Sequence, residues 1–216
     1  MPTPGTATKM TPAVSTTGSW THTTVSGEAK MHVFAYTADA TTRGLAGCTF
    51  NGTALTRLDG ADDGVWSNVE LWELNDPPIG AFTVELTALS STSVHIGGHA
   101  ISYSNAAAVN GTVAKANSTT ANPSLSVSSA SGDLVVGAVN NDNSTGATTE
   151  GGTLIAEDED VGSDNDFNSQ RVTASGSSTS LTWTQSGSGD GWAAIGVAVK
   201  SASGGAPDSV SVSHLD

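Results

Sequence analysis

Short apolar segments recur along the chain from Trp20 onward, and within most of them apolar and polar residues alternate. Alternation places successive side chains on opposite faces of a strand, and Gly, Asn, Asp and Pro between the segments mark turns. The expected strands span residues 31–37, 48–58, 69–74, 82–87, 94–103, 124–128, 134–139, 153–156, 180–184 and 192–200. So many short strands predict an all-β chain in which antiparallel sheets pack face to face, a double-sheet β-sandwich of jelly-roll type.

Two turn signals fit this pattern. Asn51-Gly52 predicts a β-hairpin, because both residues tolerate the positive φ angles of a type I′ turn. Pro77 and Pro78 predict an end to the preceding strand, since proline cannot donate to a sheet ladder.

Three sequence echoes in the same order indicate an internal repeat. They pair residues 26–28 with 131–133, 51–55 with 151–154, and 98–104 with 195–201. We interpret residues 19–201 as a sandwich with two related halves, 19–105 and 123–201; chance similarity in a chain so rich in Ser and Gly is the alternative. Residues 1–18 are expected to form an extended arm without regular structure of its own, and residues 202–216 a tail.

Charge and cysteine content exclude several classes of protein. Lys and Arg number 7 against 21 Asp and Glu, so the net charge of -14 repels phosphate backbones and no nucleic-acid partner is expected. The lone Cys48 rules out a disulfide framework and is expected to be a small buried apolar residue. No segment approaches the roughly 20 apolar residues that cross a bilayer, so no membrane insertion is expected.

Several short motifs occur in a fixed order between Trp20 and Lys200. They are WTHT at 20–23, SG at 26–27, NGTALT at 51–56, VELWEL at 69–74 followed by PPIG at 77–80, GDLVV at 132–136 and GWAAIGVAVK at 191–200. This set resembles a β-sandwich module of bacterial surface proteins and of phage structural proteins. The resemblance implies a jelly-roll-like fold on a cell or particle surface, and no catalytic residues. The module usually belongs to a longer secreted chain, whereas this sequence begins at Met1 without an export signal, which favours a virion component.

The densest acidic segment supplies candidate metal ligands. Asp158, Asp160, Asp164 and Asp166 lie close together in the sequence, and carboxylate oxygens are the ligands that Ca²⁺ prefers. The spacing does not match an EF-hand, so a solvated acidic loop is the alternative. No other cofactor is expected.

One tryptophan is a candidate ligand-binding residue. Trp66 follows the acidic pair Asp62-Asp63 and is the best candidate among the tryptophans for an exposed ring that can stack on a sugar; a place in the core is the alternative. Three other tryptophans are expected in the core: Trp20, Trp72 and Trp192.

No catalytic residues are expected. His95 and His99 are roughly 13 Å apart along one strand, too far to share a metal ion unless the strand bends. No HExxH, GxSxG or P-loop motif occurs. A glycosidase would need two carboxylates across a cleft, and fold class alone is weak support for an enzyme.

These observations lead to an expected function and one alternative. The chain is expected to be a non-enzymatic virion structural protein, a capsid decoration, head-fibre or tail-associated subunit displayed on the virion surface. Its expected partners are other copies of itself and virion proteins, contacted through residues 1–18. The alternative is an extracellular or cell-surface carbohydrate-binding or adhesin module of a bacterium, Ca²⁺-dependent, with a cell-surface glycan as its partner.

Overall fold

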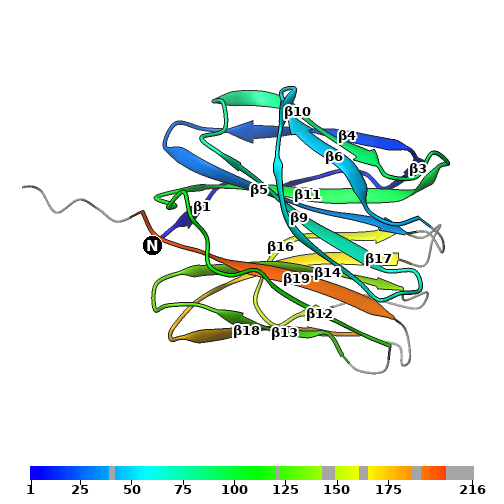
Figure 1. Ribbon diagram of the computed structural model, residues 1–216. Helices are drawn as coiled ribbons and strands as arrows, with labels where there is room; N and C mark the ends of the chain where they lie inside the picture. The colour runs from blue at the N-terminus through cyan, green and yellow to red at the C-terminus, as the bar shows by residue number, and fades with distance from the viewer. Residues whose placement is uncertain (39–41, 120–121, 143–148, 161–164, 186–190, 203–216) are drawn as a thin grey trace, which may run out of the picture.

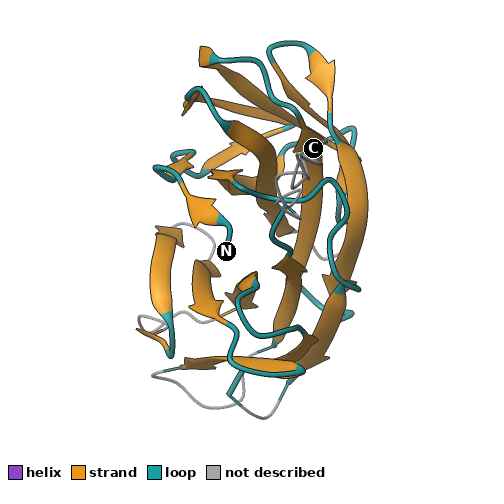
Figure 2. Cartoon of the chain, turned by 90° about the vertical axis from the view of Figure 1, so that its left-hand side faces the viewer, coloured by secondary structure: helices purple, strands orange, loops and turns teal. Residues whose placement is uncertain are grey.

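The computed structural model describes residues 1–38, 42–119, 122–142, 149–160, 165–185 and 191–202 (Figure 1). These residues form antiparallel strands joined by turns and loops (Figure 2). They contain no helix, and hence none that is long and apolar enough to span a membrane. The all-β expectation is confirmed.

The first half of the chain forms two sheets that pack on each other. Inner sheet I runs in the order β11 (Val94–Ser104), β5 (Glu28–Ala38), β9 (Asn68–Asn75) and β8 (Thr56–Asp62), with β1 (Thr3–Pro4), β2 (Thr8–Lys9) and β3 (Ala13–Ser15) along the free edge of β11. Outer sheet I runs in the order β4 (Thr17–Thr24), β10 (Gly80–Ala88), β6 (Leu45–Phe50) and β7 (Thr53–Ala54).

The second half repeats this arrangement. Inner sheet II runs in the order β12 (Ala114–Ser118), β19 (Trp192–Val199), β14 (Leu134–Asp142), β17 (Asn165–Thr173) and β16 (Thr153–Asp160). Outer sheet II contains β13 (Ser124–Ser128), β18 (Ser178–Thr184) and β15 (Thr149–Glu150). The strands of inner sheet II therefore follow the same order, by their place in each half, as those of inner sheet I.

The turn that leads into the central strand has the same hydrogen bond in both halves. Glu28 accepts a hydrogen bond from the backbone N of Val25 at 2.8 Å, and Asp133 accepts one from Ala130 at 2.8 Å. The glycines between them, Gly27 and Gly132, have φ angles of 90° and 89°. Identical strand order and an identical turn support the interpretation of two related halves over chance similarity.

The N-terminal arm belongs to this repeat. Residues 3–15 pair with β11 of their own chain, in the position that β12 takes beside β19. The expectation that residues 1–18 lack regular structure is therefore wrong. Local composition concealed the strands because their hydrogen-bond partners lie about ninety residues away on β11.

The four sheets stack as four layers, with inner sheets I and II face to face in the middle (Figure 1). Central strands are consequently buried on both faces. In β5, Val33 and Ala35 pack toward outer sheet I, whereas Phe34 and Tyr36 pack against inner sheet II. A third core fills the space between inner and outer sheet II. Because a core joins the two halves, they form one body.

Other sequence expectations are confirmed. Asn51 and Gly52 have φ angles of 51° and 74°, and Phe50 pairs with Thr53 across the hairpin. Strand β9 ends at Asn75, just before the prolines. Cys48, Trp72 and Trp192 are buried, and Trp20 packs against the core of the first half.

Candidate functional site

A polar hollow opens at the edge of the first half, where strand β8 ends inner sheet I. Its volume is about 430 Å³, and we call it the β8 hollow. It is lined by Arg43, Gly44, Leu45, Arg57, Gly60, Ala61, Asp62, Asn68, Glu70 and Leu89. Residues from β8 and β9 form one side, while residues at the start of β6 and just after β10 form the other. The hollow is thus the open end of the first sandwich.

A buried carboxylate forms part of the lining. Glu70 is 3% exposed, and its Oε2 accepts a hydrogen bond from Trp72 Nε1 at 2.9 Å. Its Oε1 lies 3.1 Å from Arg57 Nη2 and 3.4 Å from the backbone N of Leu45. Arg57 lines the hollow with a side chain that is 44% exposed, and its guanidinium has N–H donors besides the one that faces Glu70.

Two glycines make room for this ion pair. A Cβ at Gly60 would lie 2.3 Å from Arg57 Nη2, and one at Gly44 would lie 2.9 Å from Glu70 Oε1. Gly44 also has a φ of 102°, a backbone region that L-residues rarely adopt. A side chain at either position would therefore have to displace the end of Arg57 or of Glu70 from its place in this pair.

A second ion pair holds the loop after β8. Arg43 Nε donates to Asp62 Oδ2 at 2.7 Å, and Arg43 Nη1 donates to the carbonyl oxygen of Val65. The backbone N–H groups of Val65, Trp66 and Ser67 all donate to Asp63 Oδ1. These bonds fix the turn that carries Trp66, and Arg43, which lines the hollow, holds this turn through Val65. Trp66 is 45% exposed, so of the two alternatives for this ring the structure shows the exposed one, while its role in binding remains a prediction.

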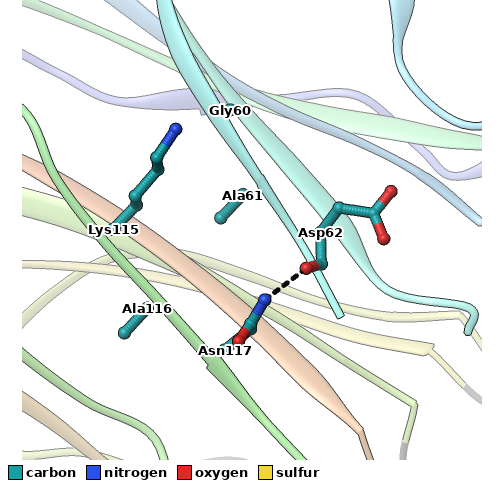
Figure 3. A pocket seen from close by; sticks show the side chains of 6 residues that line it. All are labelled: Gly60, Ala61, Asp62, Lys115, Ala116 and Asn117. Atoms are coloured by element: carbon teal, nitrogen blue, oxygen red, sulfur yellow. Dashed lines mark hydrogen bonds between the residues drawn. The ribbon is translucent and has the colours of Figure 1, made fainter. Parts of the chain in front are cut away.

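A smaller hollow of about 300 Å³ lies on the other side of β8, between β8 and β12 (Figure 3). Asn117 reaches across it from β12 and donates to the backbone carbonyl of Asp62. Lys115 Nζ lies 2.9 Å from Asp59 Oδ1, with the lysine side chain 52% exposed. This hollow is the seam between the two halves.

The buried interface between the inner sheets contains a Ser–His–Asp cluster. His99 Nδ1 lies 2.8 Å from Ser169 Oγ, and His99 Nε2 lies 2.9 Å from Asp158 Oδ2. Lys9 Nζ pairs with Asp158 Oδ1 at 2.7 Å. Burial lowers the pKa of His99, and Asp158 opposes that effect. These residue types also form hydrolase triads, but there the serine contacts Nε2 and faces substrate, whereas His99 and Ser169 are fully buried.

A second buried cluster lies near the chain segment that joins the halves. Glu73 Oε2 lies 2.5 Å from Lys30 Nζ and 3.1 Å from His32 Nε2, and it also accepts a hydrogen bond from Asn110. Burial alone would raise the pKa of Glu73, but the hydrogen bonds from His32 and Lys30 lower it to about 2. Burial lowers the pKa of His32, so the cluster pairs one ammonium with one carboxylate.

The structure separates two of the four predicted metal ligands. Asp158 pairs with Phe167 across the ladder, and Asp166 pairs with Glu159 at the next position, so their side chains project from opposite faces of inner sheet II. The side chain of Asp160 and the whole of Asp164 lie outside the described residues. Within the described part of the chain, no three His, Cys, Asp or Glu side chains are grouped closely enough to hold a metal ion.

Sequence reasoning missed the residues that line the β8 hollow. Arg57, Glu70 and Arg43 come from separate segments, and only strand pairing brings them together. The one signal in the sequence is that basic residues are few. Two of the seven Lys and Arg residues of the chain line this hollow, and Lys115 lies across β8 from it.

Comparisons with protein-family models, with curated proteins and with solved structures found no match.

Proposed function

We propose that this protein is a non-enzymatic structural protein of a virus particle, a capsid decoration, head-fibre or tail-associated subunit displayed on the particle surface. The observation that supports this most is the core between the two inner sheets, which joins two sandwiches into one four-layer body. Interfaces as large and apolar as a domain core suppress relative motion of the parts that they join. A rigid body of this kind suits a projecting part that must hold its shape.

The outer faces of the stack support the same role. In outer sheet II the exposed side chains of β13 and β18 all carry hydroxyl groups: Ser124, Ser126, Ser128, Ser178, Ser180, Thr182 and Thr184. The exposed positions of β4 are likewise Thr or Ser. Hydroxyl-rich faces stay hydrated and offer no large apolar patch for unwanted association. Such faces suit a surface exposed to the medium.

The arm offers a place for a partner to bind. Val14 in β3 is 61% exposed although β3 is paired with β11. A partner that covers this edge gains apolar burial without displacing the arm. Other copies of this chain and neighbouring virion proteins are the partners that we propose.

Rebinding to particles tests the proposal. Virions that lack the protein should recover it from solution, and the purified chain should form a defined oligomer by light scattering. Val14→Glu should weaken rebinding by about tenfold or more, whereas Val109→Glu, at a residue 73% exposed in the connecting segment, should change it less than about twofold. A chain that stays monomeric at high concentration and leaves such particles unbound would refute the proposal.

A further inference from the structure

We infer that the β8 hollow is a binding site for a neutral saccharide. Its volume of about 430 Å³ lies within the usual range for small-molecule sites, roughly 300–1,000 Å³. This inference does not depend on the proposed place in a virus particle. It rests on the charge balance of the hollow, on its exposed donors and apolar surfaces, and on a comparison between the two halves of the chain.

The charges of the hollow are balanced internally. Arg57 pairs with Glu70, and Arg43 pairs with Asp62, so a ligand with a net charge would compete with one of these pairs. Guanidinium and carboxylate groups held in this way still have N–H donors and oxygen lone pairs to offer. Each sugar hydroxyl can both donate and accept a hydrogen bond, which matches a mixed set of fixed donors and acceptors.

Apolar surfaces border these polar groups. Leu45 and Leu89 both line the hollow, and Leu89 is 59% exposed. Trp66 is on the adjoining turn, which Arg43 holds through the carbonyl of Val65. A sugar ring has apolar C–H faces as well as hydroxyl groups, and an exposed indole gives such a face a large, rigid contact at low entropic cost.

The second half shows that the fold does not require this chemistry. Allowing for the one-residue bulge after Glu28, Glu70 opposite Ala35 corresponds to Asn168 opposite Val139. Arg57 lies opposite Trp72, two residues after Glu70, and Leu154 lies opposite Gln170, two residues after Asn168. By the same register Arg57 therefore corresponds to Leu154. The same sandwich is therefore built with a leucine and an asparagine where the first half has an ion pair.

Stability is a weak reason for keeping the ion pair. The Arg57 side chain is 44% exposed but that of Glu70 only 4%, and the cost of burying such a carboxylate offsets much of its attraction to the guanidinium. The two partners also lie against glycines, and glycine within or beside a strand lowers intrinsic stability. A partly exposed arginine that lines a hollow under those conditions fits ligand recognition better than stabilisation of the sandwich.

Binding assays with defined oligosaccharides test the inference. The probes are maltotetraose, cellotetraose and chitotetraose as neutral sugars and tetragalacturonate as a charged one, each titrated into the intact chain by calorimetry after a glycan-array screen. At least one neutral saccharide should bind, and tetragalacturonate should bind more weakly than the best neutral sugar. If no neutral saccharide binds, or if the charged sugar binds best, the inference fails.

Three variants localise the binding. Arg57→Leu reproduces the residue of the second half, and Gly60→Ala displaces the guanidinium by a Cβ that would lie 2.3 Å from Nη2. Both should weaken binding about tenfold or more. Lys115→Leu is the control, because Lys115 is also about half exposed and ion-paired, with Asp59, but lines the other hollow; it should change affinity less than about twofold.

Thermal melts of each variant separate loss of binding from loss of folding. If Gly60→Ala does not fold, Arg57→Leu still decides the matter. Equal affinity of the wild type and Arg57→Leu would overturn the site, whatever sugar binds.

Discussion

The buried imidazole of His22 allows a quantitative test of how burial governs the stability of the first half. His22 in β4 is fully buried, with Nδ1 2.8 Å from Thr8 Oγ1 and Nε2 2.8 Å from Ser102 Oγ. Thr8 also accepts a hydrogen bond from Trp20 Nε1 at 3.0 Å. Phe50 lies edge-on, 6.0 Å away between ring centroids. The imidazole thus links the arm, outer sheet I and β11 through hydroxyl groups, and none of these partners is a carboxylate.

Burial lowers the pKa of His22 from 6.5 to about 4. Because the folded pKa is below the unfolded one, the stabilising contribution is complete above pH 6.5 and is lost as the pH falls toward 4. A tenfold change in proton affinity corresponds to about 1.4 kcal/mol, so the loss approaches about 3 kcal/mol at pH 4. That is a large share of the 5–15 kcal/mol typical of a folded domain.

The assay compares the wild type with His22→Gln by urea denaturation at intervals from pH 8 to pH 4.5. Glutamine keeps one donor and one acceptor but does not titrate, so the difference in free energy of unfolding isolates His22. The other buried histidines and Glu73 are common to both proteins and cancel in this difference. We expect the wild type to lose about 2–3 kcal/mol relative to the variant over this range. A difference that stays constant within about 0.5 kcal/mol would refute the reasoning.

Three further substitutions test the packing by urea denaturation. The ring centroids of Phe167 and Tyr36 lie 4.9 Å apart across the interface between the inner sheets. Phe167→Ala should therefore lower the free energy of unfolding by about 3–5 kcal/mol, with one unfolding transition as in the wild type. Gly97→Ala should cost about 1–3 kcal/mol, because its Cβ would lie 2.4 Å from the Tyr36 ring. Glu73→Gln should cost about 3–5 kcal/mol, since it leaves the fully buried Lys30 ammonium without its anion; a loss below about 1 kcal/mol would contradict that account.

The strand pattern predicted the fold class but not the number of layers. Alternation identified β10 and β18, whose outer faces meet solvent. The run at 134–139 is apolar at nearly every position, and such a run is typical of a strand covered on both faces. A single two-layer sandwich offers no place for such a strand. That run therefore carried the signal for the stack of two sandwiches, although the sequence did not indicate which sheets would meet.

The candidate site was harder to predict because its residues are joined by long-range pairing. The acidic segment looked like a loop, yet Asp158 is in a strand and faces the interface. Local sequence did not reveal that Lys9, 149 positions earlier, would reach it. The exposure of Trp66 was predictable from its place beside Asp62-Asp63 because it depends on the local turn.

A lysine occupies the corresponding position in each half, but the carboxylates that the two lysines contact differ in burial. Lys9 lies opposite His99 in β11, and Lys115 lies opposite Ile195 in β19, so the two lysines occupy corresponding positions. Each one reaches a carboxylate on the edge strand of the other half, Asp158 in β16 or Asp59 in β8.

The Asp158 side chain is 2% exposed and that of Asp59 is 35% exposed. Leaving a buried charge unpaired is far more costly than leaving an exposed one. The Lys9 contact therefore restricts how the inner sheets align, whereas the Lys115 contact tolerates change. The contact between the halves therefore constrains the edge that carries β8 less than the edge that carries β16, and Arg57 lies on this less constrained edge.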